Sequence, residues 1–167
     1  MDKNIMHPNG YFHFHKGHYL EKNVIDSLYN VENEEYSKIQ CKNEDAADYL
    51  YTNAEIFLHG SCNLFALALY EKFRYKVYEI KDNQDRMVHI FCRATYRGQI
   101  VYIDIRGVTT DFVECVSEFW NCLYNGYYII THNMQEDKSL GDEGDKTGYR
   151  FAQSIIKKYC GYYDTSM

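Results

Sequence analysis

The sequence predicts an α+β domain in which helices pack on an antiparallel sheet. An apolar run with helical spacing begins at Cys62 and continues to about Phe73. Three runs that favour β-strands follow it, over 76–80, 87–95 and 99–105. Only a short turn at Arg97-Gly98 separates the last two runs, and such a turn joins antiparallel neighbours. We therefore expect a sheet of four or more antiparallel strands, with the Cys62 helix packed on it.

The chain length fits a single domain. Its 167 residues are enough to bury a core without disulfides or metals, and no internal repeat divides them. We assign residues 1–167 to one domain. Within it, residues 1–22 are expected to form a polar N-terminal arm, and residues 133–148 a mobile acidic loop.

Helices are also expected before the strands. Residues 23–41 are weakly patterned and should form a short helix or a loop. A helix over 43–58 begins with acidic residues, which suit a helix N-terminus, and it should end near Gly60. The next helix, over 61–73, carries Cys62.

The C-terminal part is expected to add two helices and one strand. Residues 107–111 should form a loop with a helix cap, and a helix over 111–123 should follow. A turn at Asn125-Gly126 leads into a strand over 127–131. The final helix is expected over 149–159.

Composition and charge exclude some classes of function. A formal net charge of −6 gives no support to general polyanion binding. No signal region opens the chain and no stretch is long enough to cross a bilayer, which favours the cytoplasm and no membrane contact. Six cysteines without a C-x-x-C pair favour free thiols, although their even number leaves disulfides open. Eighteen tyrosines predict many half-buried rings with hydrogen-bonded hydroxyl groups.

Three residues form the candidate catalytic site. Cys62 stands where its helix should begin, and free backbone N–H groups and the helix dipole stabilise a thiolate there. His89 and Asp104 lie on successive expected strands. A cysteine, a histidine and an aspartate in this arrangement can act as nucleophile, base and orienter.

The strand alternation supports this assembly. His89 shares one face of its strand with Phe91, and Asp104 shares one face of the next strand with Tyr102 and Arg106. If the apolar residues of both strands point to one core layer, His89 and Asp104 lie on the same side of the sheet. They should then meet as cross-strand or diagonal neighbours.

Four residues around Cys62 belong to the expected substrate and oxyanion region. His59 is either a second polar group in the cleft or a helix-end residue. Gly60 would let the backbone approach a substrate closely. Ser61 and Asn63 flank the nucleophile, and the backbone N–H of Cys62 would supply one oxyanion donor.

Each site residue also has a purely structural explanation. A cysteine that precedes an apolar helix commonly packs in a core, and an aspartate in a strand often pairs only with an arginine such as Arg106. We predict no cofactor and no metal. The histidine cluster at His7, His13, His15 and His18 is better explained as a polar arm than as a transition-metal site.

The segments Gly60–Ala66, His89–Phe91 and Tyr102–Gly107 resemble the core of papain-like cysteine hydrolases, with the NlpC/P60 and transglutaminase-like groups as the nearest branches. The resemblance covers about residues 59–107. It implies Cys62 as nucleophile, His89 as base and Asp104 as orienter. It also implies a papain-like fold and chemistry at amide bonds, although some relatives have lost catalysis or serve other tasks. The separation of Cys62 from His89, 27 residues, is short for these families.

Three functions compete on this basis. The first is a small cysteine hydrolase or acyl-transferase that acts on an amide or isopeptide bond of a peptide or other amide substrate. The second is an interaction protein of a phage or mobile element, similar to anti-CRISPR inhibitors, that blocks a guide-RNA nuclease by binding or by RNA cleavage. Its partner would be a protein or a ribonucleoprotein. The third is an inactive relative in which Cys62 is a core residue. The oligomeric state is left open.

Overall fold

One five-stranded antiparallel sheet organises the molecule. The computed structural model describes residues 17–28 and 53–166 of the chain. The strand order is β4-β3-β2-β1-β5, which confirms the predicted α+β class and antiparallel sheet. The strands are β1 (Lys76–Asp82), β2 (Met87–Tyr96), β3 (Gln99–Asp104), β4 (Gly107–Thr109) and β5 (Tyr127–Thr131).

The β2–β3 hairpin fixes the register on which the candidate site depends. Tyr96 pairs with Gln99, so Arg97 and Gly98 alone form the turn. Both have positive φ, 50° and 79°, as a two-residue turn that matches the twist of the strands requires. The predicted hairpin is therefore confirmed, and it places residues of β2 and β3 opposite one another as far as Cys92 and Ile103.

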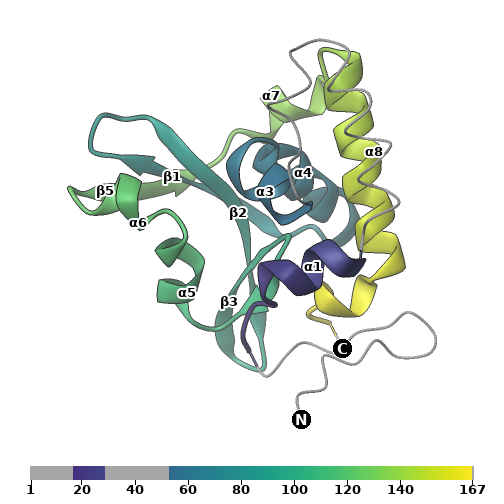
Figure 1. Cartoon of the computed structure of the whole chain (residues 1–167), viewed down its shortest axis with the longest axis horizontal. Helices are drawn as coiled ribbons and strands as arrows, with labels where there is room; N and C mark the ends of the chain where they lie inside the picture. The colour runs from purple at the N-terminus through teal and green to yellow at the C-terminus, as the bar shows by residue number, and fades with distance from the viewer. Residues whose placement is uncertain (1–16, 29–52, 167) are drawn as a thin grey trace.

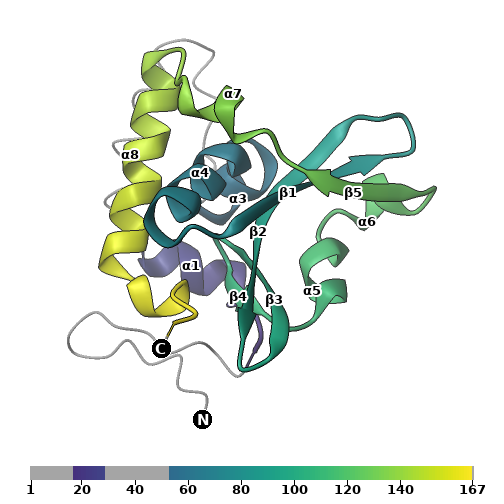
Figure 2. The same ribbon diagram turned by 180° about the vertical axis from the view of Figure 1, so that it is seen from behind.

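Helices cover the two faces of the sheet. Helix α4 (Cys62–Phe73) begins at the predicted residue and packs on one face, where the Cys92 thiol lies 3.8 Å from the carbonyl oxygen of Ala66. Helices α3 (Asn53–His59) and α8 (Glu143–Lys158) lie on the same side (Figures 1 and 2). On the other face, Phe119 stacks on His89. Phe119 lies between two short helices, α5 (Phe112–Ser117) and α6 (Trp120–Leu123).

The expected acidic loop over 133–148 is wrong, because most of it is helical. Helix α7 occupies Met134–Lys138, and α8 begins at Glu143, six residues before the expected start of the last helix. The side chains of Asn133 and Asp142 cap these helices by accepting hydrogen bonds from Gln135 N and Asp145 N. The acidic residues that suggested a loop stand in first helical turns, where the helix dipole favours negative charge.

Two smaller expectations are corrected in the segment after β3. Residues 107–111 are not a loop throughout, because β4 pairs with β3 through Ile103 and Val108. The single helix expected over 111–123 is broken at Phe119, which has φ −109° and ψ 13°. The break turns the Phe119 ring into the interior, where 2% of its surface is exposed.

The N-terminal arm expected over 1–22 is wrong for its last six residues, 17–22. The Leu20 N–H donates to the Arg106 carbonyl at 2.9 Å, and the Thr110 N–H donates to the Gly17 carbonyl at 2.9 Å. Helix α1 (Lys22–Leu28) then begins. Residues 1–16 lie outside the described part of the chain, and so do His7, His13, His15 and the expected start of the helix over 43–58.

Buried tyrosines pack the C-terminal segment against the core. Tyr163, which follows the short 3-10 helix Cys160–Tyr162, is fully buried and donates its hydroxyl proton to the Ile105 carbonyl at 2.9 Å. Tyr75 donates to the Tyr163 carbonyl at 2.6 Å. The hydroxyl groups of these two rings are hydrogen-bonded as expected, but the rings are buried, whereas half-buried rings were expected.

Two other expectations concern thiols and membranes. The described cysteines are free: Cys62, Cys92, Cys115, Cys122 and Cys160. Cys41 lies outside the described residues. Within the described ranges, the helices are all too short or too polar to cross a bilayer.

Candidate active site

Cys62 is the first residue of α4, and its thiol faces the sheet. The Sγ atom forms hydrogen bonds with the backbone of Ile90 on β2 and of Asn63. Ile90 pairs with Glu79 of β1 but lies beyond Cys92 and Ile103, where the pairing of β2 with β3 ends. The thiol therefore reaches the β2 backbone next to His89, where β3 has separated from β2.

His89 and Asp104 form the predicted pair. Asp104 Oδ2 lies 3.0 Å from His89 Nε2, and both side chains are buried, with 0% and 3% of their surface exposed. The register places Asp104 nearly opposite Phe91, two residues along β2 from His89 and on the same face. The contact is therefore the diagonal one that strand alternation predicted.

The unpaired nitrogen of His89 is the chemically open position. Asp104 engages Nε2, and Nδ1 is buried without a hydrogen-bond partner among the residues that the structure describes. Burial lowers the pKa of His89, and the positive charge of Arg106 adds to this effect, while Asp104 opposes it. The imidazole is thus neutral at pH 7, with Nδ1 able to accept a proton.

Burial dominates the electrostatics of the thiol. It raises the pKa of Cys62 to about 11, although hydrogen bonds with the backbone of Ile90 and Asn63 act in the opposite direction. The expected stabilisation of a thiolate by the helix N-terminus is therefore outweighed by desolvation. Within the described residues, Cys62 and His89 share no hydrogen bond. His89 and Asp104 are thus in direct contact, whereas the thiol lies against the adjacent Ile90 backbone and is protonated at rest.

Arg106 completes the buried network, and sequence analysis offered it only as a structural partner for Asp104. Its Nε donates to Asp104 Oδ1 at 3.0 Å, and its Nη2 donates to Oδ2 at 2.5 Å. Burial alone would raise the pKa of the Asp104 carboxyl. The Arg106 guanidinium and the hydrogen bond with His89 outweigh burial and hold this pKa far below its usual range. The signal was present in the sequence, since Arg106 follows Asp104 by two positions and shares its face.

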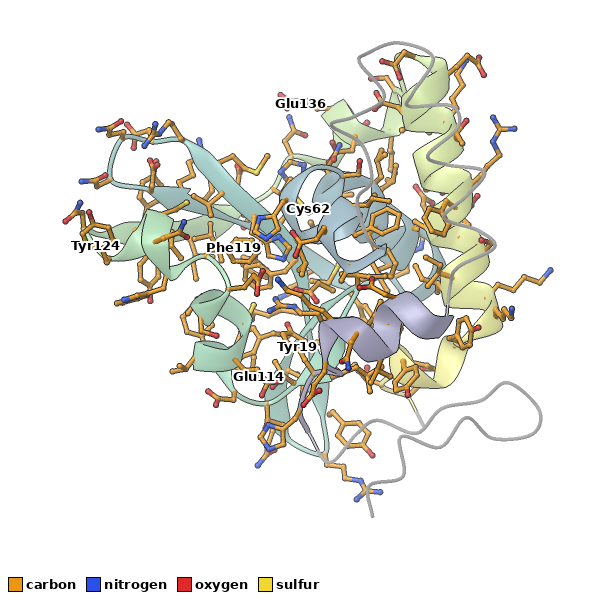
Figure 3. The ribbon with its side chains drawn as sticks, in the orientation of Figure 1. Tyr19, Cys62, Glu114, Phe119, Tyr124 and Glu136 are labelled. Atoms are coloured by element: carbon orange, nitrogen blue, oxygen red, sulfur yellow. The ribbon has the colours of Figure 1, made fainter. Side chains whose placement is uncertain are left out.

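Phe119 was not recognised as a site residue. Its ring stacks on the His89 imidazole with centroids 4.5 Å apart and an interplanar angle of 25°. His59 contacts the same ring edge-on at 5.3 Å. Figure 3 shows Cys62 and Phe119 in the interior of the molecule, away from Tyr124 at its outer end. No short-range sequence pattern marks Phe119, because its position depends on the break between α5 and α6.

The residues around Cys62 take different positions. His59 ends α3 with its side chain 38% exposed, and its Nε2 lies 3.0 Å from Glu118 Oε1. Gly60 is exposed, and a Cβ there would lie 3.4 Å from the Ile56 carbonyl oxygen.

The Ser61 side chain forms no capping hydrogen bond for α4. Asn63 donates its side-chain N–H to Asp137 Oδ1 at 3.2 Å.

The Lys22 ammonium group lies between carboxylates that could otherwise bind a metal. Glu55, His59 and Glu118 bring three ligand atoms within 4.8 Å of one another. Lys22 Nζ donates to Glu55 Oε1 at 2.8 Å and also to Glu118 Oε1. An ammonium group between the carboxylates satisfies their charge, so these contacts join α1, α3 and the α5–α6 junction.

A second histidine–aspartate pair lies beyond Asn63. Asp137 of α7 accepts hydrogen bonds from Asn63 Nδ2 and His132 Nε2. The hydrogen bond to Asp137 raises the pKa of His132 against the effect of burial. The Asn63 side chain is thus held by α7, and its expected place in the substrate and oxyanion region stays a prediction.

Comparison of the chain with protein-family models, curated proteins and solved structures gives no match. The resemblance to papain-like hydrolases therefore stays a prediction.

Proposed function

We propose that the protein is a cysteine hydrolase or acyl-transferase that acts on an amide or isopeptide bond, with a papain-like arrangement of its site. The observation that carries the proposal is the His89–Asp104 pair next to the strand backbone that the Cys62 thiol contacts. Asp104 binds Nε2, and Nδ1 has no hydrogen-bond partner within residues 17–28 and 53–166. A buried imidazole nitrogen without a partner costs free energy. A proton-transfer role next to a thiol explains why this arrangement is present.

The mechanism follows from the protonation states. His89 Nδ1 takes the thiol proton as Cys62 Sγ attacks the carbonyl carbon, because a thiol with a pKa of about 11 is not ionised at rest. The backbone N–H of Cys62, at the start of α4, would donate to the oxyanion. The imidazolium then protonates the leaving amine. A thioester remains, and water or a second amine, deprotonated by His89, resolves it.

The buried resting state implies that the site must open before it reacts. Cys62 is 5% exposed, His89 0% and Asp104 3%. The free cysteines agree with action in a reducing cytoplasm. A peptide that enters the site has to displace the Phe119 ring from His89.

Peptide mass spectrometry of iodoacetamide labelling tests the proposal first. We expect Cys62, which is 5% exposed, to react faster than Cys92, which is 0% exposed, in a reaction that His89→Ala slows because His89 accepts the thiol proton. Cys92 serves as the internal control, since burial also raises its pKa and its thiol lies 3.8 Å from the Ala66 carbonyl oxygen of α4. Equal labelling of Cys62 and Cys92, unchanged in His89→Ala, would exclude a working dyad.

A second candidate is a protein that acts by binding, such as an inhibitor of a guide-RNA nuclease similar to anti-CRISPR proteins. It is favoured by the exposed aromatic side chains of α6 and β5, which include Trp120 (53% exposed), Tyr124 (64%) and Tyr127 (39%). Large exposed apolar side chains that gather on one surface often mark interaction sites.

Cys62→Ser and Trp120→Ala separate the two candidates. If the protein is an enzyme, Cys62→Ser abolishes thioester formation and Trp120→Ala leaves it unchanged. If it acts by binding, Cys62→Ser retains partner capture from a phage-infected or nuclease-containing lysate, and Trp120→Ala weakens capture by about tenfold or more. Capture that depends on Cys62 but not on Trp120 would contradict the binding role.

A further inference from the structure

Arg106 occupies both oxygens of the Asp104 carboxylate. Oδ1 accepts from the Arg106 backbone N–H at 2.9 Å and from Nε at 3.0 Å. Oδ2 accepts from Arg106 Nη2 at 2.5 Å and lies 3.0 Å from His89 Nε2. The carboxylate thus accepts hydrogen bonds from Arg106 at both oxygens, whereas the imidazole contacts Oδ2 alone.

The guanidinium is itself held in one place. Nη1 donates to the Glu114 carbonyl at 3.3 Å, and Nη2 donates to the Cys115 carbonyl at 3.1 Å. The Tyr19 ring lies 4.1 Å from the guanidinium carbon on one side, and the Phe119 ring lies 6.0 Å away. Arg106 is 5% exposed. These contacts leave the group no freedom to turn away from Asp104.

We propose that Arg106 is a positioning residue of the candidate site, which neutralises and orients Asp104 so that His89 rests as a neutral imidazole. This inference rests on the proposed function and describes how the same site is regulated. A carboxylate without such a partner would draw a proton onto the imidazole. Here burial of the imidazole and the charge of Arg106 both oppose that attraction, so Nδ1 stays an acceptor and Asp104 serves to fix the ring orientation and the Nε2–H tautomer.

The charged groups around His89 determine which way its pKa moves when Arg106 is lost. Asp104 favours the imidazolium, whereas Arg106 and His59 oppose it. Cys62, at the start of α4, is an uncharged thiol that lies against the backbone of Ile90, the residue after His89. Glu118, at the α5–α6 junction, is paired with Lys22 and His59. Loss of the Arg106 charge therefore removes one repulsion and leaves Asp104 uncompensated, and both changes favour protonation of His89.

The test is the titration of His89 by ¹H–¹⁵N NMR of the histidine side chains. In Arg106→Gln we expect the titration midpoint of His89 to rise by about 1 pH unit or more, since one charge beside a buried group has an effect of this size. Arg93→Gln is the matched control, because Arg93 lies on the same face of β2 and contacts the Tyr78 ring at 4.9 Å. Arg106→Lys, which keeps the charge but loses the planar fork, should restore most of the wild-type midpoint.

Two results would overturn the inference. One is a His89 midpoint that Arg106→Gln and Arg93→Gln leave equally unchanged. The other needs no variant: a wild-type spectrum in which His89 is an imidazolium at pH 7, or carries its proton on Nδ1, contradicts the proposed resting state even if Arg106→Gln does not fold. Neither readout requires turnover, so failure of the cysteine hydrolase proposal would leave this titration decisive by itself.

Discussion

Asp104→Ala is expected to destabilise the domain by about 3–5 kcal/mol, because it leaves a buried arginine without its counter-charge. Arg106 is 5% exposed, and two of its side-chain donors bond to the Asp104 carboxylate. The alanine variant leaves these donors unsatisfied in an apolar interior and also removes the partner of His89 Nε2. The measurement is urea unfolding at pH 7, followed by circular dichroism.

A double variant of Asp104 and Arg106 separates the effect of an unpaired buried charge on stability from the effect of lost packing. Asp104→Leu with Arg106→Met removes both charges and fills similar volume, and it should recover most of the lost free energy of unfolding. The surface carboxylate of Glu71, which lies 3.7 Å from Arg74 Nη1 and 3.8 Å from Lys138 Nζ, is the control, because Glu71→Ala should cost about 0–1 kcal/mol. If Asp104→Ala costs no more than Glu71→Ala, the network does not stabilise the fold.

This prediction has a consequence for any assay of activity. A loss of activity in Asp104→Ala would report unfolding as well as the loss of an orienter. The double variant keeps the fold while it removes the orienter, so activity that it lacks can be attributed to the orientation of His89. Structural and catalytic roles of Asp104 are then measured on one folded background.

The sheet and the Cys62 helix could be predicted because their signals are local. Strand alternation placed His89 and Asp104 on one face, and a two-residue turn set their register. The helix starts at 134 and 143 were missed, although Asn133 and Asp142 are good caps, because clustered acidic residues and glycines also suit loops. A cap can be recognised only once the helix that follows it is recognised.

The state of the site could not be predicted, because residues distant in sequence determine it. Phe119 and Arg106 surround His89 and Asp104, and Tyr19 packs on Arg106 from the N-terminal segment. Figure 3 shows Tyr19 beside Glu114, 95 residues later in the chain, which accepts a hydrogen bond from the Tyr19 N–H. The position of Cys62 at a helix start predicts a stabilised thiolate, whereas burial in the folded chain raises the pKa of the thiol to about 11.

Phe119→Ala is expected to open the site as well as to destabilise the protein. The ring is 2% exposed and covers the His89 imidazole at 4.5 Å, so its loss should cost about 3–5 kcal/mol in the free energy of unfolding. The cavity lies beside His89, so water and small reagents gain access there first. We expect iodoacetamide to label Cys62 about tenfold faster or more, which corresponds to 1.4 kcal/mol in the free energy of opening.

Local opening and global unfolding predict different ratios of labelling. Cys92 is fully buried between β2 and α4, away from Phe119, and becomes reactive only when that packing is lost. Local opening in Phe119→Ala raises the ratio of Cys62 to Cys92 labelling, whereas global unfolding raises both rates and leaves the ratio unchanged. Phe112→Ala is the matched control, because this ring belongs to the same α5–α6 segment but packs on Tyr102 at 5.2 Å. An unchanged ratio in Phe119→Ala, equal to that in Phe112→Ala, would show that Phe119 is a core residue and does not gate the thiol.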